Sequence, residues 1–345
     1  MPADPIRVAL IGAGHWGPNL IRSFHDNPRS EVAWVIDKDP ARVEGVRQRF
    51  PGVRTGDDAE LALSDPDVHA VVVATPTIGH YALTKSALSR GKHVLVEKPL
   101  TRTSAEGEEL CELAASRQLV LLVGHVFLYN GAVRRVKQYL ADGELGRVFY
   151  VSMVRTNLGP IRMDVNAAWD LASHDLSIVG YWVDSEPISV SAIGGTWINE
   201  GLADTVFATL RYPGDVLVNL HVSWLNPRKA RDVTVVGDRR MLTFDDMSLS
   251  EPIRIYDKQV TDTRGRPGFI DTFGSFRLNV RDGDIIIPKV SNAEPLRAET
   301  ENFLASIDGT EKPVSDGRRA VAVVRALEAM DRSMRNAGRE EAVRA

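Results

Sequence analysis

The sequence predicts a two-domain α/β protein, with an N-terminal doubly wound parallel sheet of the Rossmann type and a C-terminal α/β domain built on an open, mostly antiparallel sheet. Three observations predict this architecture. The chain has 345 residues, which is enough for two cores. In its first third, short apolar runs alternate with amphipathic stretches, as in right-handed strand–helix–strand crossovers. After about Gly124, longer runs dominate, and several alternate polar and apolar residues. We therefore expect a first domain over residues 1–123 and a second over 124–345.

The first domain is predicted to consist of strand–helix units. The run Ala-Val-Val-Val-Ala at 70–74 is typical of a strand buried on both faces of a parallel sheet. Thr103 or Ser104 can cap a helix whose early turns are acidic. The remaining strands are expected at 7–11, 32–36, 93–96 and 119–123, and the helices at 19–25, 40–50, 80–90 and 104–117.

The second domain is predicted to be rich in strands. The segment 216–223 alternates polar and apolar residues, which predicts a sheet with one wetter face. Residues 157–172 are expected to form a loop, and residues 257–284, rich in Asp, Arg and Gly, a long excursion. Strands are expected at 147–155, 188–197, 205–211, 216–224 and 232–236, with helices at 132–140, at 177–183 and near the end of the chain.

Composition and charge exclude several classes of protein. The formal net charge is −4, which gives no reason to expect nucleic acid or an anionic membrane as a partner. The single cysteine, Cys111, cannot form an intrachain disulfide, and its spacing in a predicted helix favours core packing. We find no zinc-type cluster, no secretory signal and no apolar run of about 18 residues. We therefore expect no metal and a cytoplasmic location.

A glycine-rich turn predicts a dinucleotide site. Residues 12–17 match G-x-G-x-x-G between a predicted strand and a predicted helix, which is the context that gives this motif meaning. Gly12 allows a tight turn, Gly14 lets the backbone approach the pyrophosphate, and Gly17 allows close packing of helix on strand. His15 and Trp16 lie inside the same turn. The helix N-terminus offers free N–H groups to the phosphates, whereas the alternative is a purely structural turn.

The second strand ends in a carboxylate that favours NAD. Asp37 follows Gly17 by about 20 residues, the place where an acidic residue binds the adenosine ribose hydroxyls. Its charge would repel the 2′-phosphate of NADP, although Lys38 could offset part of that repulsion. NAD is therefore favoured over NADP. The alternative role, capping the helix that begins near Pro40, suits Asp39 better.

Two further strand ends are expected to border the cofactor. Ligands of open α/β sheets bind at the carboxyl ends of the strands, where Thr75 and Pro76 follow one strand and Glu97 and Lys98 follow the next. A partly desolvated lysine can bind a substrate oxygen and stabilise developing alkoxide charge. In isolation, a surface salt bridge between Lys98 and Glu97 would explain the pair equally well.

The motifs together resemble the Gfo/Idh/MocA family, named for glucose–fructose oxidoreductase and inositol 2-dehydrogenase. The likeness is carried by GAGHWG at 12–17, TPTIGHY at 75–81 and above all VLVEKPL at 94–100. It implies an NAD(P)-dependent dehydrogenase or reductase acting on CH–OH groups, with Lys98 as the catalytic lysine. It also implies a C-terminal sheet through which such chains form homodimers or homotetramers.

A second marker, Asp170-x-x-x-His174, matches the catalytic pair of the same family. On a helix, residues four apart share one face, so both side chains can reach one pocket. His174 can accept the hydroxyl proton while hydride leaves for the nicotinamide, because the reference pKa of histidine lies near neutrality. Asp170 can orient the imidazole or bind a neighbouring hydroxyl. Asp175, about 100° around the helix, is expected to be structural.

Other family positions are matched less fully. His80 resembles a histidine at the start of the helix after the Thr-Pro turn, where capping or packing would explain it equally well. His125 resembles a position near the active site. Tyr129 and Asn130 stand in Leu-Tyr-Asn-Gly, where many relatives carry Arg-Phe-Asn-Pro, so a role tied to that arginine is in doubt here.

The segment before Asp170 bears on the substrate. Arginine forks suit phosphate or carboxylate, and Trp169 offers a flat face to a sugar ring or base. The segment resembles the branch of the family that acts on nucleotide-linked sugars, at a 3-hydroxyl or 3-keto group. Ion pairing of the two arginines with surface carboxylates is the plain alternative. The expected substrate-binding residues are Lys98, His125, Arg155, Asn157, Arg162, Trp169, Asp170 and His174.

Two other functions stay open at this point. One is a dehydrogenase of a free sugar or cyclitol such as inositol. The other, from a different class, is a nicotinamide-binding regulator without turnover, against which the retained Lys98, Asp170 and His174 argue. The sequence does not show the reaction direction, the nucleotide or the ring carbon.

Overall fold

The computed structural model describes residues 4–198, 200–260 and 280–344, which form two compact units. The N-terminal unit contains the chain up to Asn130 together with Ala293–Glu328. The C-terminal unit contains Gly131–Asn292 and Ala329–Ala345. A segment near the end of the chain thus joins the first unit, and the last residues join the second.

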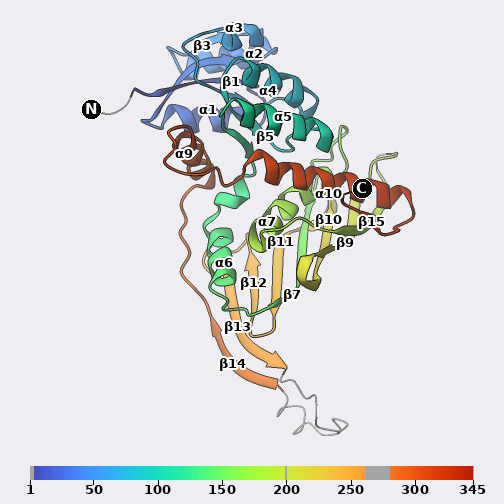
Figure 1. Ribbon diagram of the computed structural model, residues 1–345. Helices are drawn as coiled ribbons and strands as arrows, with labels where there is room; N and C mark the ends of the chain where they lie inside the picture. The colour runs from blue at the N-terminus through green and yellow to red at the C-terminus, as the bar shows by residue number, and fades with distance from the viewer. Residues whose placement is uncertain (1–3, 199, 261–279, 345) are drawn as a thin grey trace. The chain divides into compact units, whose positions relative to one another are not determined.

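The N-terminal unit is built on a six-stranded parallel sheet in the order β3-β2-β1-β4-β5-β6 (Figure 1). This is the strand order of a Rossmann fold, so the predicted fold class is confirmed. The strands are β1 (Ile6–Ile11), β2 (Ser30–Ile36), β3 (Arg54–Gly56), β4 (Ala70–Val73), β5 (His93–Glu97) and β6 (Leu121–Gly124). The helices between them are α1 (Gly17–His25), α2 (Pro40–Arg49), α3 (Ala59–Leu63), α4 (His80–Ser89) and α5 (Ser104–Ser116).

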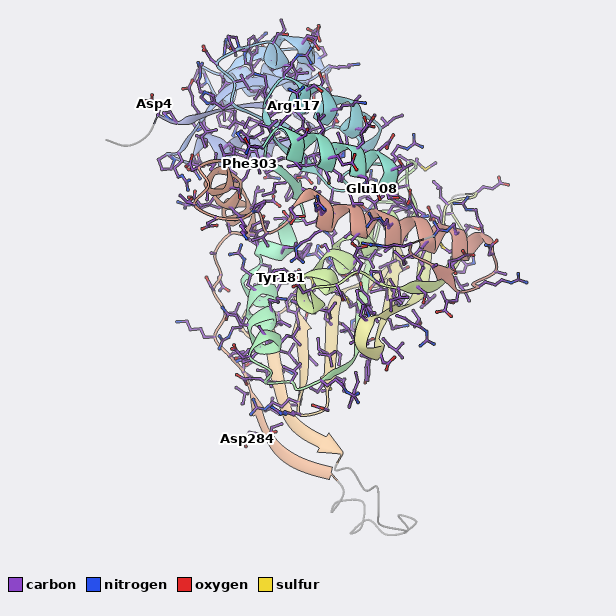
Figure 2. The ribbon with its side chains drawn as sticks, in the orientation of Figure 1. Asp4, Glu108, Arg117, Tyr181, Asp284 and Phe303 are labelled. Atoms are coloured by element: carbon purple, nitrogen blue, oxygen red, sulfur yellow. The ribbon has the colours of Figure 1, made fainter. Side chains whose placement is uncertain are left out.

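Apolar side chains cover both faces of this sheet. All four residues of β4 are buried, as expected for a central parallel strand. On one face, Phe24 of α1 packs edge-to-face on Phe303 of α9 (Pro295–Ile307), with ring centroids 6.2 Å apart; Figure 2 labels Phe303. Leu296 and Leu304 of α9 join the same core. This burial explains why α9 belongs to the first unit.

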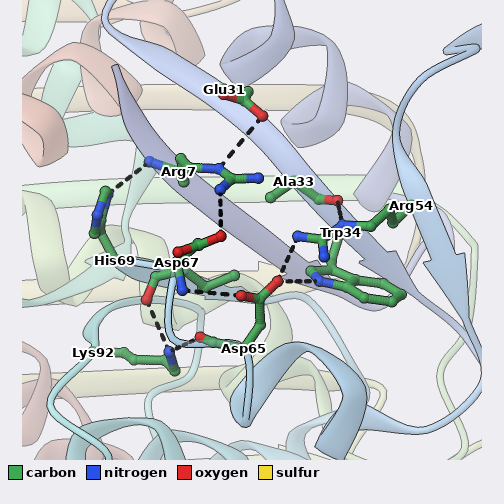
Figure 3. Close-up of polar contacts among 10 residues, drawn as sticks. Arg7, Glu31, Ala33, Trp34, Arg54, Asp65, Asp67, His69 and Lys92 are labelled. Atoms are coloured by element: carbon green, nitrogen blue, oxygen red, sulfur yellow. Dashed lines mark hydrogen bonds and ion pairs between the residues drawn. The ribbon is translucent and has the colours of Figure 1, made fainter. Parts of the chain in front are cut away.

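A polar network occupies the amino ends of the parallel strands (Figure 3). Trp34 Nε1 donates to Asp65 Oδ2 at 2.8 Å, and Arg7 Nη1 donates to Asp67 Oδ2 at 3.0 Å. The buried Lys92 donates to the carbonyl oxygens of Asp65 and Val68 at 2.7 and 2.8 Å. These contacts fix the edge of the sheet that lies opposite the glycine turn.

The C-terminal unit is built on a nine-stranded sheet in the order β14-β13-β12-β11-β7-β10-β9-β8-β15. Among the described pairings, β7 and β10 are parallel and the others are antiparallel, which confirms the predicted sheet type. The strands are β7 (Val148–Leu158), β8 (Ser189–Gly195), β9 (Thr205–Tyr212), β10 (Val216–Ser223), β11 (Leu225–Gly237), β12 (Met241–Asp245), β13 (Ile253–Val260), β14 (Val280–Ile286) and β15 (Glu341–Ala342).

Helices α6 (Gly131–Ala141) and α7 (Ser173–Val183) lie against one face of this sheet (Figure 1). The strands alternate accordingly: in β9, Ala208 and Leu210 are buried whereas Phe207 and Thr209 are exposed. The last long helix, α10 (Gly317–Arg335), contributes residues to both units.

The predicted excursion over 257–284 was partly wrong. Strand β13 continues to Val260 and pairs with β14 from Val280, so both ends of the segment are strand; residues 261–279 lie outside the described part. In β13, Ile253 and Ile255 are buried on either side of the exposed Arg254. The charged residues that predicted a loop are typical of strands near a sheet edge.

Candidate active site

The glycine turn after β1 has the backbone that a dinucleotide site needs. Gly12 has a φ of +106°, and a Cβ placed there would lie 2.5 Å from the carbonyl oxygen of Ala74. A Cβ on Gly17 would lie 2.4 Å from the carbonyl oxygen of Gly12. Neither position tolerates a side chain. Helix α1 begins without a side-chain cap at Trp16, so a phosphate oxygen can accept from the Gly17 N–H; Pro18 has no N–H, and that of Asn19 bonds the Trp16 carbonyl oxygen at 3.0 Å.

Asp37 holds the glycine turn from the end of β2. Its Oδ2 accepts a hydrogen bond from the backbone N–H of Ala13 at 2.7 Å, and its Oδ1 accepts one from Asp39 at 2.9 Å. Arg42 reaches the same carboxylate at 3.5 Å. Asp39, not Asp37, caps α2 by accepting from Ala41, as the sequence predicted. Asp37 therefore brings its charge to the place where the adenosine ribose is expected.

His80 links the two turns at the carboxyl ends of β4 and β5. It is buried, its Nε2 lies 2.8 Å from the carbonyl oxygen of Thr75, and its Nδ1 lies 2.8 Å from that of Pro99. The imidazole therefore fixes the Thr75-Pro76 turn relative to the Lys98-Pro99 turn. The sequence left capping and packing open for His80 and did not show this link between two turns; its predicted contact with the cofactor stays a prediction.

Lys98 follows β5 beside two ionisable side chains of the same unit, those of Glu97 and His125. The carboxylate of Glu97 accepts a hydrogen bond from the Lys98 backbone N–H at 3.2 Å. Burial raises the pKa of Glu97 to about 7, although the positive charge of Lys98 opposes this. Burial and then Lys98 lower the pKa of His125 to about 3. His125 is therefore neutral near pH 7 and is not an acid there.

Asp170 and His174 lie at the start of one helical segment in the C-terminal unit. Residues Ala168–Ala172 form a π-helical turn that leads directly into α7, so the predicted loop over 157–172 ends earlier than expected. Such turns are rare and are often found at functional sites. The turn sets the direction of the Asp170 side chain, while His174 lies in the first turn of α7.

Two donors hold the carboxylate of Asp170. Arg162 Nη1 lies 3.3 Å from Oδ1, and Trp224 Nε1 donates to Oδ2 at 3.1 Å. Arg162 also bonds Asp164 through its Nε at 2.9 Å. Trp224 is fully buried at the end of β10 and was not among the predicted site residues. Its only sequence signal was an aromatic residue at the end of a predicted strand.

The other predicted substrate residues are held by contacts within the C-terminal unit. Arg155 is buried in an ion pair with Asp175 at 2.7 Å, which gives Asp175 the structural role expected for it. Asn157 donates to the carbonyl oxygen of Gly159. Trp169 keeps part of its surface exposed while its Nε1 donates to Asp331 of α10 at 2.8 Å.

Tyr129 has a structural position in the N-terminal unit. Its buried hydroxyl lies 2.9 Å from Asn302 and 3.1 Å from Ser315.

Within the ranges that the structure describes, no group of His, Cys, Asp and Glu side chains is arranged to hold a metal ion. No described helix is long and apolar enough to cross a membrane.

The predicted catalytic residues therefore come from both units. Lys98, with Glu97, His80 and His125 around its turn, belongs to the N-terminal unit, and the Asp170–His174 segment belongs to the C-terminal unit. An ammonium, an imidazole and a carboxylate are the groups that hold a hydroxyl and move its proton.

Comparisons with known proteins show the family of the chain. Residues 6–125 match the model of the oxidoreductase family with an NAD-binding Rossmann fold, and residues 133–243 match the GFO/IDH/MocA C-terminal domain. The chain is 30% identical to a UDP-N-acetylglucosamine 3-dehydrogenase from Acidithiobacillus ferrooxidans, over 90% of this chain and 92% of that protein. A solved structure of that enzyme superposes with a TM-score of 0.79 at 26% identity, covering 96% of this chain and 100% of the other.

Relatives with other substrates are also similar. An inositol 2-dehydrogenase from Acidothermus cellulolyticus is 30% identical over 63% of this chain and 66% of its own length. The family models confirm the predicted NAD-binding domain and the predicted family. The chain thus belongs to the Gfo/Idh/MocA family of NAD-dependent oxidoreductases.

Proposed function

We propose that this enzyme transfers a hydride between NAD and a ring carbon of a nucleotide-linked sugar, at a 3-hydroxyl or 3-keto group. The observation that carries the proposal is the match to a UDP-N-acetylglucosamine 3-dehydrogenase along nearly the whole of both chains. The C-terminal unit, which supplies the expected substrate residues, is included in that match. Matches to inositol dehydrogenases cover a smaller share of the chain.

In this proposal, Lys98 and His174 act on the reacting oxygen. When bound, NAD would supply the hydride acceptor for oxidation, and the imidazole of His174 would take the hydroxyl proton. Lys98 donates a hydrogen bond to the same oxygen and stabilises its negative charge. Asp170, held by Arg162 and Trp224, orients the imidazole or a neighbouring hydroxyl. The reverse sequence serves reduction.

Gly12, Gly14, His15, Trp16 and Gly17 are the proposed cofactor contacts on the glycine turn. The remaining proposed contacts are Asp37 for the ribose and, toward the nicotinamide, Thr75, Pro76, Glu97 and Lys98. His80 acts there through the two turns that it links.

Arg162 is the proposed phosphate-binding residue of the substrate site. Its side chain is 31% exposed, whereas the guanidinium of Arg155 is held in the buried pair with Asp175. Arg155 therefore contributes to substrate binding through the position of α7 and not by direct contact. Asn157, Trp169 and His125 complete the proposed set, with the exposed part of Trp169 available to a sugar ring or base.

The exposed face of the C-terminal sheet supports a homodimer or homotetramer. Tyr150, Ile193, Phe207 and Leu217 are exposed on its strands, and the strand register pairs Tyr150 with Leu217 and Ile193 with Phe207. Phe207 stacks on His221 with ring centroids 4.4 Å apart. Exposed apolar side chains on a sheet face are typical of a protein interface. We also propose the cytoplasm as the location, since the enzyme depends on NAD and on activated sugars.

The proposal is tested by following reduced nicotinamide with a panel of substrates. We expect turnover with NAD and at least one nucleotide-linked sugar, at a higher kcat/KM than with the matching free sugar. Turnover restricted to free sugars or inositols would favour a dehydrogenase of a free sugar or cyclitol. Tight NAD binding with no turnover on any of them, in either direction, would favour the regulator.

A further inference from the structure

The turn that carries Lys98 contains a carboxyl group pressed against the next strand. Glu97 is paired in register with Gly124 of β6. A Cβ placed on Gly124 would lie 2.9–3.0 Å from the carboxyl atoms of Glu97, so this carboxyl lies directly over the Gly124 backbone. Its Oε2 accepts from the Lys98 N–H, while its Oε1 is inaccessible to solvent and has no hydrogen-bond partner among the described residues.

A second carboxyl group is contributed by α9, close enough to Glu97 for the charge of one group to act on the other. Glu299 is fully buried, and in the described part of the chain neither of its oxygens has a hydrogen-bond partner. Asn302, one turn further along, bonds the Tyr129 hydroxyl, so this face of α9 packs on the segment that follows His125. An ionised carboxylate buried without partners is very costly, and the group avoids that cost by keeping its proton.

We propose that Glu97 and Glu299 form a buried carboxyl pair that holds one proton at neutral pH, with Glu299 as the acid and Glu97 as the carboxylate that positions Lys98. Glu97 is thus a positioning residue, and Glu299 acts through it. The inference deepens the proposed function, on which it rests for the role of Lys98. With its proton, Glu299 can donate a hydrogen bond to the Glu97 carboxylate, which two ionised carboxylates could not do.

The order of ionisation is set by the surroundings of the two groups. Burial raises the pKa of Glu97, but the charge of Lys98, the Lys98 backbone N–H and the Trp16 side chain all lower it. Burial raises the pKa of Glu299 well above its ordinary range, and the charge of Glu97 raises it further. Glu97 therefore ionises first, and Glu299 keeps the shared proton.

Other ionisable groups near the pair leave this balance unchanged. His125, which follows Gly124, is neutral near pH 7 because burial lowers its pKa. The charged groups on the outer side of α9 pair with residues of α1 and of the turn that follows it. Those on α4 pair with α5. These pairs are Arg22 with Glu294, Arg29 with Glu301 and Asp308, and Lys85 with Glu109.

The carboxylate of Glu97 has two effects on Lys98. Its hydrogen bond fixes the backbone at the lysine, and its charge stabilises the ammonium form beside the reacting oxygen. Protonation of Glu97 at lower pH removes that charge. The value of kcat/KM should then fall at acid pH as Glu97 becomes protonated.

The first test observes the proton directly and needs no substrate. Infrared difference spectra of the full-length enzyme, wild type minus Glu299→Gln, are recorded at about pH 7.5 in H2O and D2O. We expect the carbonyl stretch of a protonated, buried carboxylic acid, shifted by deuterium, in the wild type and its loss in the variant. Glu301→Gln, on the same helix but half-exposed, is the matched control and should keep the band. A wild type without the band overturns the proposal.

The second test follows stability against pH. The folded chain holds a proton that the unfolded chain releases above about pH 4.3, so unfolding of the wild type releases more protons than that of Glu299→Gln. We expect the urea midpoint of the wild type to fall more steeply than that of the variant between about pH 5 and 8. Equal slopes would contradict a protonated Glu299.

The third test uses turnover and separates the pair from the proposed function. Glu299→Gln keeps a hydrogen-bond donor for Glu97. It should therefore retain the acid limb of the pH profile, which is the fall of kcat/KM at acid pH. Glu299→Leu removes the donor and should shift that limb about one pH unit upward. Glu97→Gln should lower kcat about tenfold or more and abolish this limb. An acid limb that is unchanged in Glu299→Leu overturns the positioning role. If no sugar substrate is found, the first two tests still decide whether the pair holds its proton.

Discussion

The indole of Trp224 donates a hydrogen bond to Asp170 Oδ2 at 3.1 Å, and the two residues are 54 positions apart in the chain. Trp224 is fully buried at the end of β10, whereas Asp170 lies in the π-helical turn before α7. The strand therefore fixes a carboxylate on the helical segment that carries His174. This hydrogen bond therefore holds the π-helical turn in place through Asp170.

Replacing Trp224 by Phe should reduce catalysis more than stability. The substitution keeps an aromatic ring but removes the donor to a carboxylate, a hydrogen bond worth about 1.5–3 kcal/mol. We expect kcat/KM to fall about tenfold or more, with kcat carrying most of the loss. Steady-state kinetics with the best substrate will measure it.

Trp182→Phe is the matched control for that experiment. Trp182 is also buried in the C-terminal unit, and its Nε1 donates to the carbonyl oxygen of Val133 at 2.9 Å, away from Asp170. We expect this variant to lose a similar amount of stability but to keep kcat within about twofold. Equal kinetic losses in both variants would show that Trp224 acts through packing alone.

Asp37 should control the choice between NAD and NADP. Asp37→Asn keeps an oxygen that can accept from the Ala13 N–H but removes the negative charge that repels a 2′-phosphate. With Arg42 nearby at 3.5 Å, the ratio of kcat/KM for NAD to that for NADP should fall about tenfold. The control is Asp39→Asn, which alters the cap of α2 without changing this ratio. A ratio that stays the same in Asp37→Asn would contradict the assignment.

The sequence predicted the parallel sheet well because its signals are local. Strand β4 is an unbroken apolar run between turns, and the glycine turn has its own spacing. The short strand β3, Arg-Thr-Gly, carries no such signal and was missed, as was α3. In β13, the charged residues hid the alternation of Ile253 and Ile255.

Contacts between distant segments were beyond the reach of the sequence. The apolar positions of α9 show which face is buried but not that Phe303 packs on Phe24, so the sequence did not show that α9 belongs to the first unit. The motifs identified Asp170 but could not show that Trp224 and Arg162 hold it. His80 was recognised by position alone, and its bridge between two carbonyl oxygens required the folded backbone.

Asp65 should stabilise the N-terminal unit in a pH-dependent way. The bond from Trp34, then that from the Asp67 backbone and the contact with Arg54, lower its pKa from 3.8 to about 2 although burial opposes them. Because the folded-state pKa is depressed, the stabilisation is present above about pH 4 and is lost as pH falls toward 2. Asp65→Asn should cost about 1–2 kcal/mol at pH 7 and nothing below about pH 2.

Urea unfolding at several pH values will measure this difference. Asp67→Asn is the control, because its carboxylate is 67% exposed and its ion pair with Arg7 is screened by water. Its effect should stay within about 0.5 kcal/mol. A wild-type minus Asp65→Asn difference that does not vary with pH would contradict the depressed pKa.

The buried pair of Arg155 and Asp175 should behave as a structural unit. Asp175 lies in α7 next to His174, and burial raises its pKa while Arg155 lowers it. Removing one partner, as in Arg155→Met, leaves an unpaired buried charge and should cost about 3–5 kcal/mol. The double variant Arg155→Met, Asp175→Leu should be more stable than either single one. Urea unfolding of all four proteins tests this, and additive losses would contradict it.

Arg162 should distinguish a nucleotide-linked substrate from a free sugar. Arg162→Ala removes a partly exposed guanidinium that can form charge-assisted bonds to a phosphate. Calorimetric affinity for a nucleoside diphosphate should fall about tenfold or more, because such bonds are worth about 1.5–3 kcal/mol. Since Arg162 also holds Asp170 at 3.3 Å, kcat is expected to fall as well, so binding is the deciding readout. Arg228→Ala, which removes a guanidinium that is 80% exposed, is the control and should leave the affinity unchanged. If both variants bind the diphosphate as tightly as the wild type, the phosphate site lies elsewhere and a free sugar becomes the favoured substrate.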